Sequence, residues 1–295
     1  MKYEFMQGHD GKFSIERMSK MLGISRSGYY SFAKRLPSQQ KLDEERLLVK
    51  IKEIYESSRH TYGSPRIHAE LKEQGETCSR QRVAKLMKRA EIMAKMTKKF
   101  KVTTKVNSKA KTAPNLLEQN FTAAEPNQRW VADISYVWTL EGWLYVACVL
   151  DLFSRKIVGL AMHDRMKDDL VIAALEQALT HRNPLPGLVH HSDKGCQYTS
   201  HDFQKKLAQH NIIASMSGTG NCYDNAAMES FFHTLKTEHI YFERYKTREE
   251  AKGSIFEYIE VFYNRQRRHS TLDYKSPLAF EQNYQQSSVR LHSVH

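Results

Sequence analysis

The chain of 295 residues carries 45 Lys and Arg against 33 Asp and Glu, a formal net charge of +12, and 40% of its residues are hydrophobic. This composition excludes global disorder, and the length predicts about two domains. No apolar run reaches the ~18 residues of a membrane-spanning helix, and the first residues lack the apolar stretch of a secretory signal. We therefore expect a cytoplasmic protein with no membrane partner, whose cysteines stay reduced because none lies in a CxxC motif.

The excess of positive charge is confined to one end of the chain. Residues 1–128 hold 26 Lys and Arg against 14 Asp and Glu, whereas residues 129–295 hold 19 of each. Charge segregated in this way indicates an N-terminal surface that contacts a polyanion. The alternative is that the charge serves solubility alone, but solubility would not require the asymmetry.

Residues 1–38 are expected to form a helix-turn-helix. Ser14 and Ser25 are suited to cap two short helices, because a serine side chain can accept a hydrogen bond from a free backbone N–H of the first turn. The connecting Leu-Gly-Ile-Ser-Arg-Ser turn would place the second helix, with Arg26 and Ser27, in the major groove of DNA. A small helical hairpin without a DNA contact is the alternative.

Residues 39–94 are expected to form a second helical DNA-binding unit. Pro65 suits the first turn of one helix, and Ser79 is suited to cap the next. That last helix carries five basic residues and no acid over ten positions, a pattern that favours contact with phosphates over an ordinary solvated face. The five are Arg80, Arg82, Lys85, Lys88 and Arg89.

Residues 95–128 are expected to form a basic linker. Seven lysines and no acid lie between residues 95 and 111, and we assign DNA contacts to Lys98, Lys99 and Lys101. This stretch is expected to be extended and ordered by DNA.

From residue 129 onward the pattern changes to strands and helices in the order β-β-β-α-β-α-β-α. This order predicts an α/β fold: a ribonuclease H-like catalytic core over residues 129–285, with a mixed five-stranded sheet, helices on both faces and C-terminal helices, followed by a tail at 286–295. The expected strands are Arg129–Leu140, Trp143–Leu150, Lys156–Met162, Leu188–His191 and Ile212–Met216. The expected helices are Lys167–His181, Ser200–His210, Asn225–Ile240 and Arg248–Tyr263.

Three carboxylates are expected to meet in this core. Asp133 lies in an apolar strand, where burying a bare carboxylate costs several kcal/mol unless it is paired or bound to a cation. Asp193 follows the strand expected beside the first, and Glu229 lies one turn into a helix that Asp224 or Asn225 would cap. Such carboxylates would repel one another, and two Mg²⁺ ions, with Mn²⁺ as a substitute, would relieve the repulsion.

Each acid also has an ordinary interpretation. Asp133 could pair with a backbone group or an arginine, Asp193 could be a turn residue, and Glu229 could face solvent. The three together favour a metal site for phosphoryl transfer. Glu238 would lie on the opposite side of the helix from Glu229, whereas Lys236 lies within about 20° of Glu229 and is expected to reach a DNA phosphate or remain solvated.

Several motifs of this chain resemble those of bacterial insertion-sequence transposases, the Asp-Asp-Glu enzymes related to retroviral integrases. The motifs are Trp130–Ser135, His191–Tyr198, Asn221–Phe231, Tyr263–Leu272, Ser276–Phe280 and Tyr62–Ile67. The resemblance covers about residues 2–285 and is closest to the second-reading-frame product of a two-frame element. We assign further DNA contacts to Arg66 and Asn225, which lie in two of these motifs.

The resemblance implies that Asp133, Asp193 and Glu229 are catalytic metal ligands. It implies cleavage at the 3′ ends of the element by water, then transfer of the freed 3′-hydroxyl to target DNA. It also implies a multimer that pairs the terminal inverted repeats, and a possible first-frame partner. The loop Ser217–Gly220 differs from the more basic loop of the family. The zinc module of the integrases is absent from this sequence, so His190 and His191 are interpreted as strand-end residues.

Two other functions are compatible with parts of the pattern. A non-catalytic DNA-binding regulator of transposition would explain the basic N-terminal part, but it has no need of buried acids. A nuclease acting on RNA–DNA hybrids would explain the core, but not the two helical DNA-binding units. The sequence therefore favours a bacterial DNA transposase that associates with the nucleoid when bound.

Overall fold

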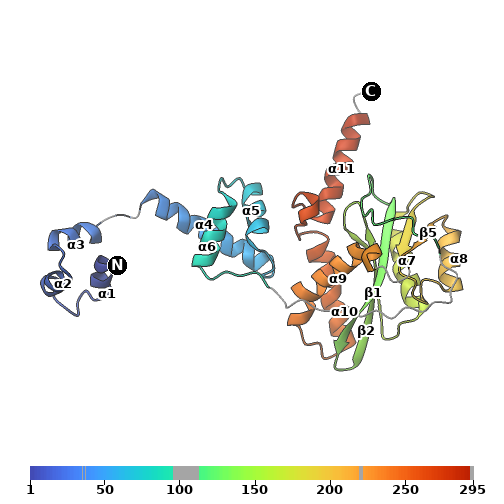
Figure 1. The fold of residues 1–295 in the computed structure, drawn as a ribbon, viewed down its shortest axis with the longest axis horizontal. Coiled ribbons are helices and arrows are strands. Elements are labelled where there is room, and N and C mark those ends of the chain that lie inside the picture. The colour runs from blue at the N-terminus through green and yellow to red at the C-terminus, as the bar shows by residue number, and fades with distance from the viewer. Residues whose placement is uncertain (35, 37, 96–112, 219–221, 293–295) are drawn as a thin grey trace.

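A computed structural model describes residues 1–34, 36, 38–95, 113–218 and 222–292. The first part is a cluster of three short helices at one end of the molecule (Figure 1). Their bounds are α1 Lys2–Gly8, α2 Ile15–Leu22 and α3 Arg26–Ala33. The expected caps are confirmed, since Ser14 accepts from Arg17 N and Ser25 accepts from Gly28 N. Helix α1 was not expected, because no side chain caps it and Met6 is its one buried residue.

The second helical unit consists of α4 Gln39–Ser57, α5 Ser64–Glu73 and α6 Arg80–Arg89. Its buried side chains belong to a hydrophobic cluster that continues into the C-terminal helices of the chain. Tyr62 makes the link explicit: its hydroxyl accepts from Arg268 N at 2.7 Å and donates to Gln266 O at 3.3 Å. Arg268 also pairs with Glu70 on α5 at 2.6 Å. The second helical unit is therefore packed onto the rest of the protein.

The core is a mixed sheet of five strands in the order β3-β2-β1-β4-β5, which confirms the expected arrangement. The strands are β1 Arg129–Thr139, β2 Gly142–Asp151, β3 Ile157–His163, β4 Val189–Ser192 and β5 Ile213–Met216. Strands β1, β2 and β3 form an antiparallel meander, while β4 runs parallel to β1 and to β5. Strand β4 pairs with the first three residues of β1, Arg129–Val131, so β1 extends well beyond it.

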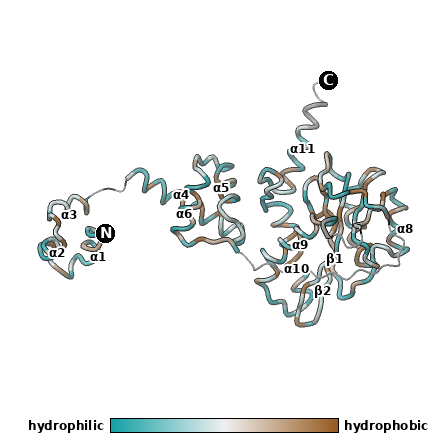
Figure 2. Tube along the Cα trace, in the orientation of Figure 1, coloured by the Kyte–Doolittle hydropathy of each residue, from teal (hydrophilic) through white to brown (hydrophobic). Residues whose placement is uncertain are grey.

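Helices cover both faces of this sheet, and hydrophobic residues are concentrated along its strands (Figure 2). On one face, α7 Asp168–Arg182 and α8 His201–Gln209 cover a cluster that includes Trp130 and Ala132. Helix α7 approaches β3 closely at Gly159, where an added Cβ would lie 2.1 Å from the carbonyl oxygen of Ala174. Only glycine fits at this contact. On the other face lie α9 and the C-terminal helices.

The C-terminal part begins with a short 3₁₀ turn, Cys222–Asn225, which leads into α9 Ala226–Glu238. Helix α10 Arg248–Glu257 continues as the π-helical stretch Tyr258–Tyr263 rather than as the uniform helix expected. Two more 3₁₀ turns are Ile240–Phe242 and Ser270–Leu272. Helix α11 Pro277–His292 extends away from the sheet (Figure 1). Among the helices of the described chain, none is long and apolar enough to cross a membrane.

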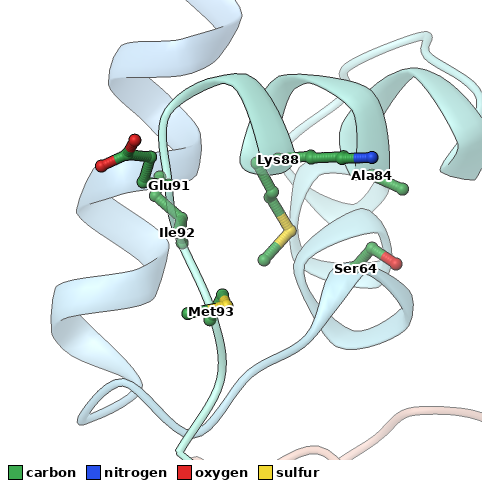
Figure 3. A pocket seen from close by; sticks show the side chains of 7 residues that line it. Ser64, Ala84, Lys88, Glu91, Ile92 and Met93 are labelled. Carbon is green, nitrogen blue, oxygen red and sulfur yellow. The ribbon is translucent and has the colours of Figure 1, made fainter.

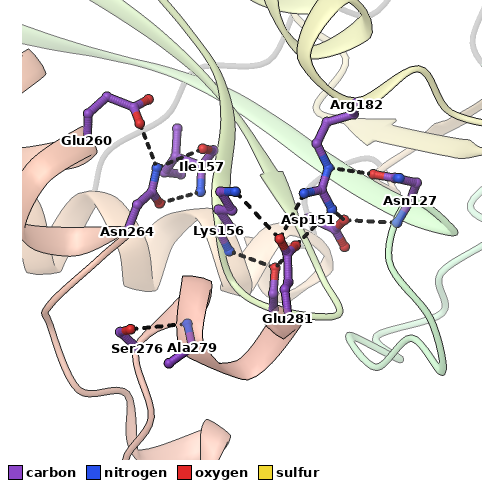
Figure 4. Close-up of polar contacts among 11 residues, drawn as sticks. Asn127, Asp151, Lys156, Ile157, Arg182, Glu260, Asn264, Ser276, Ala279 and Glu281 are labelled. Carbon is purple, nitrogen blue, oxygen red and sulfur yellow. Dashed lines mark hydrogen bonds and ion pairs between the residues drawn. The ribbon is translucent and has the colours of Figure 1, made fainter. Parts of the chain in front are cut away.

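A buried network of charges fastens α11 to the sheet (Figure 4). Arg182, at the end of α7, donates to Asp151 at 3.0 Å and to both carboxylate oxygens of Glu281 at 2.8 Å. Asp151 is fully buried at the end of β2. It accepts a hydrogen bond from Phe153 N, as a turn residue does, and it also forms the ion pair with Arg182.

Candidate active site

The pairing of β1 with β4 brings two of the expected acids to the same level of the sheet. Val131 is in register with His191. Asp133 and Asp193 therefore each lie two residues beyond the last pair of this ladder. Neighbouring strands are about 4.8 Å apart, so the two side chains lie in one region. The order of the elements predicts this proximity, because it places β4 beside β1.

The electrostatics of Asp133 indicate that the acids influence one another. Burial first, then the charge of Asp193 and that of Glu229, raise the pKa of Asp133 to about 7, although a hydrogen bond from Ile134 N opposes the rise. Burial likewise raises the pKa of Asp193, which accepts a 2.9 Å hydrogen bond from Gly195 N. The site therefore concentrates negative charge in a partly desolvated region.

Glu229 lies in the first turn of α9 with an exposed side chain, and partial burial raises its pKa. Within the described chain, no three Asp, Glu, His or Cys side chains are close enough to hold one metal ion together. The acids are thus neighbours that act on one another's charge, and their closure around a cation is a proposal taken up below. Repulsion between like charges favours such separation.

Lys236 lies two turns after Glu229 on α9. Burial lowers its pKa, and the negative charge of Asp133 opposes that effect. Its ammonium nitrogen lies 5.1 Å from the centre of the Tyr136 ring. Lys236 thus lies near both Asp133 and an aromatic side chain of β1.

The loop before α9 differs from expectation. Asn225 is at the N-cap position, but its side chain makes no capping hydrogen bond and instead donates to Ala132 O at 3.2 Å. Asp224 accepts from Gly218 N at 2.7 Å and from Gln119 at 3.4 Å, so it joins loops instead of capping the helix. The prediction of a side-chain cap by either residue is wrong, because acceptors and donors distant in sequence compete for these side chains.

Asn225 is placed to position the site. It is 7% exposed, and its bond to Ala132 ties the start of α9 to the strand residue immediately before Asp133. Its Oδ1 is buried and finds no hydrogen-bond partner within the described residues. A direct DNA contact by Asn225 would require this buried side chain to become accessible.

Several of the basic residues assigned to DNA are engaged by acids. Arg82 pairs with Asp43 at 2.8 Å, and Arg89 pairs with Glu44 at 2.7 Å. Both acids lie on α4, so a neighbouring helix supplies the negative charge that is missing within α6. On α6, Arg80, Lys85 and Lys88 remain exposed. Lys88 borders a hollow that Ser64, Ala84 and Met93 also line (Figure 3).

The other assigned DNA contacts have diverse positions. Arg66 pairs with Glu238 of α9 at 3.1 Å, which joins the second helical unit to the core. Arg26 lies 3.8 Å from Glu16 with both side chains exposed, and Ser27 donates to Ser25. Lys98, Lys99 and Lys101, like Gly220 of the loop that departs from the family pattern, lie outside the described residues.

Glu238 belongs to a buried ion cluster that sequence reasoning missed. It accepts from Arg267 Nε at 2.6 Å, from Arg267 Nη2 at 2.7 Å and from the Tyr258 hydroxyl at 2.9 Å. Together with the bond from Arg66, these contacts account for both carboxylate oxygens. The basic residues of the motif Tyr263–Leu272 were the sequence signal for this cluster, but the spacing in the sequence did not identify Glu238 as their partner.

Three family models match parts of this chain. The model described as "Integrase core domain" matches residues 123–222, and a second of that description matches residues 229–284. The model described as "HTH-like domain" matches residues 41–100. The matches follow the division between the second helical unit and the sheet.

Solved structures with a similar course of the chain include retroviral proteins. A simian T-cell lymphotropic virus intasome, in complex with PP2A regulatory subunit B56 gamma, aligns with a TM-score of 0.47 at 14% identity over 78% of this chain and 74% of that chain. The HTLV-2 integrase catalytic core domain, in complex with magnesium, aligns with a TM-score of 0.43 at 14% identity over 54% of this chain and 98% of that chain.

Sequence relatives are far closer. An "Insertion element IS600 uncharacterized 31 kDa protein" of Shigella sonnei is 47% identical over 92% of this chain and 100% of its own length. "Transposase InsF for insertion sequence IS3A" of Escherichia coli (strain K12) is 41% identical over 95% of this chain and 98% of its own length. At this identity over almost the whole of both chains, the protein belongs to the IS3 family of insertion-sequence transposases, which carry an integrase core domain.

Proposed function

We propose that this transposase cleaves DNA at the ends of its insertion sequence and joins the freed 3′-hydroxyl to target DNA by two-metal phosphoryl transfer. The observation that carries the proposal is the register of β1 and β4, which puts Asp133 and Asp193 side by side. Glu229 acts electrostatically on the same group. These three side chains are the proposed catalytic residues and metal ligands.

The donor set fits a divalent cation. All three side chains offer carboxylate oxygens, the ligands that Mg²⁺ prefers. Burial, and then the charges of Asp193 and Glu229, raise the pKa of Asp133 to about 7, and a bound cation would offset this cost of ionising the carboxyl group. The chemistry that bound Mg²⁺ or Mn²⁺ supplies at such a cluster is activation of water or a 3′-hydroxyl and stabilisation of the leaving oxygen.

The remaining residues have supporting roles in the proposal. Lys236 attracts the DNA phosphate to the edge of the acidic cluster, because its ammonium group is the cation that acts on Asp133. Asn225 holds the start of α9 against Ala132 and so fixes the helix that carries Glu229. Partial burial of Asp133 and Asp193 limits access of bulk water.

The N-terminal part is proposed to hold DNA in place. Exposed Arg80, Lys85 and Lys88 of α6 would contact phosphates, and α3 would lie in a major groove. The DNA bound would include the terminal inverted repeats and the target. The active form is proposed to be a multimer, with a first-frame product of the same element as a possible further partner.

Strand cleavage by purified protein tests the proposal. Incubated with terminal-repeat DNA and Mg²⁺ or Mn²⁺, the wild-type chain should nick or join strands, and Asp193→Asn should abolish this while DNA binding is retained. Asp202→Asn, a change to an exposed acid on α8, is the matched control and should keep activity. Activity that survives in Asp193→Asn would refute the catalytic assignment. If the wild-type protein binds the DNA but does not cleave it, even when a first-frame partner is present, the result would favour a non-catalytic regulator.

A further inference from the structure

Three aromatic rings are exposed together on the β1–β2 hairpin. Tyr136 is 53% exposed, Trp138 57% and Trp143 43%. Trp143 makes edge contacts with both others, at ring-centre distances of 5.0 Å to Tyr136 and 4.8 Å to Trp138. We call these three residues the aromatic patch. A contiguous group of exposed rings is unusual on a soluble protein and indicates a binding surface.

The patch is exposed because the helices on that face stop short of it. Further along the same face, Trp130 and Ala132 of β1 are buried under α7 and α8. Trp138 pairs with Trp143 across the ladder near the hairpin turn, where those helices no longer cover the sheet. Figure 1 shows this hairpin at the end of the sheet opposite α11. The sequence therefore places large rings where no part of the described chain buries them.

The patch approaches the acidic site across the edge of β1, because the rings share the face of Trp130 and Ala132, whereas Asp133 lies on the face covered by α9. The Lys236 ammonium lies 5.1 Å from the ring centre of Tyr136 and acts on the charge of Asp133. Along β1, Tyr136 and Trp138 are three and five residues from Asp133, odd separations that put the rings and the carboxylate on opposite faces of the strand. Beyond Val131 the edge of β1 that faces β4 has no strand paired to it in the described ladder. A strand of DNA that leaves the acidic site past Lys236 and crosses this edge of β1 would reach the rings.

Cations border the rings. Lys236 lies over Tyr136, and Arg248 donates from Nε to the carbonyl oxygen of Trp143 at 3.1 Å. One acid is also near, since Glu141 accepts from the backbone N–H of Arg248 at 2.8 Å. Flat rings beside cations suit a nucleic acid strand, because bases stack on the rings while the backbone lies against positive charge.

We propose that the aromatic patch binds unpaired nucleobases of the DNA whose phosphate occupies the acidic site, with Lys236 contacting the backbone between the two. The proposal rests on the proposed function, because that function puts DNA at Asp133. It adds a stacking site that favours melted or overhanging ends over continuous duplex.

Binding of metal-free full-length protein to two DNA probes tests the proposal. One probe is a blunt duplex, and the other is the same duplex with a five-nucleotide oligo-dT overhang. The overhang should bind more tightly and quench tryptophan emission, since Trp130 is fully buried and the emission that DNA can reach comes from Trp138 and Trp143. Trp138→Ala should weaken overhang binding about 5- to 150-fold, the equivalent of ~1–3 kcal/mol of stacking per base.

Two further variants, compared with Trp138→Ala, complete the experiment. Trp138→Phe keeps a ring and should restore most of the overhang binding, which also guards against a folding defect in Trp138→Ala. Tyr241→Ala removes a ring of similar exposure (48%) from outside the patch and should change neither probe. Blunt-duplex binding should be unchanged in all three.

Equal binding of both probes by the wild type, or overhang binding unaffected by Trp138→Ala, would overturn the proposal. If Trp138→Ala changes self-association, as measured by sedimentation, and leaves DNA binding unchanged, the stacking proposal is overturned in favour of an interface between copies of this chain. If overhang binding depends on Trp138 while the wild type never cleaves DNA, the stacking site stands and the proposed enzymatic function fails. If cleavage occurs and Trp138 has no effect on overhang binding, the stacking proposal alone fails.

Discussion

Replacing Glu238 by Gln should destabilise the fold, whereas replacing Glu229 by Gln on the same helix should not. Glu238 accepts four hydrogen bonds, among them two from Arg267, whose side chain is 4% exposed. Removing one partner of a buried ion pair leaves a charge without compensation and costs about 3–5 kcal/mol. Glu229 is exposed, so its substitution should change the unfolding free energy by no more than about 0.5 kcal/mol.

Urea denaturation of the two variants beside the wild type measures this difference, with strand cleavage measured in parallel. The expected result is a reciprocal pattern: Glu238→Gln loses stability, while Glu229→Gln keeps stability and loses cleavage. Equal stability of all three proteins would refute the reasoning about the buried cluster. A large stability loss in Glu229→Gln would contradict its assignment as an exposed functional residue.

The pH dependence gives the same cluster a second signature. Burial raises the pKa of Glu238, but the hydrogen bonds and charge of Arg267, the charge of Arg66 and the hydrogen bond from Tyr258 outweigh it and lower the pKa below 4.5. A carboxylate whose pKa is depressed on folding contributes stability above its unfolded value and loses it as the pH falls through the folded value. The stability gap between wild type and Glu238→Gln should therefore be full near pH 7 and shrink below about pH 4.5.

Three further perturbations follow from described contacts. Gly159→Ala should lower the free energy of unfolding by about 2 kcal/mol or more and reduce the melting temperature, because the new Cβ would lie 2.1 Å from Ala174 O. Gly253→Ala is the control: its Cβ would meet nothing within 4 Å, so the change should be neutral or stabilising. Arg182→Met should lower the free energy of unfolding by about 3–5 kcal/mol, because the buried carboxylates of Asp151 and Glu281 would lose their cationic partner. Helix α11 should then become sensitive to limited proteolysis, and unchanged proteolysis would contradict a role of Arg182 in fastening α11. Changing both Lys85 and Lys88 to Gln should weaken binding to any DNA duplex and reduce the slope of log K against log salt concentration by about two. Fluorescence anisotropy measures this slope, and an unchanged slope would show that α6 is not part of the DNA interface.

The sheet could be predicted because its information is local. Alternation of apolar residues and turn positions identified each strand within a few residues, and the order of elements fixed their arrangement. The proximity of Asp133 and Asp193 followed, since the order of elements places the strand before Asp193 beside the strand that contains Asp133. The position of Glu229 could also be predicted, because the helical pattern places it in the first turn of a helix.

Other features depend on partners distant in the sequence, which patterns do not encode. Asn225 reads as a helix cap, but Ala132, 93 positions earlier, accepts its hydrogen bond. Arg82 reads as a free cation on an acid-free helix, but Asp43, 39 positions earlier, lies on the helix packed beside it. In both cases tertiary packing overrides a local preference that was correctly recognised.

The shared hydrophobic cluster between the second helical unit and the C-terminal helices limits how this protein can be recombined. Tyr62 and Glu70 of the second helical unit are bonded to Arg268, near the opposite end of the chain. A chimera that exchanges residues 39–94 with those of a relative would break these bonds unless the segment around Arg268 is exchanged with them. Specificity for DNA ends should therefore be inherited as a pair of segments that are far apart in the gene and joined in the folded protein.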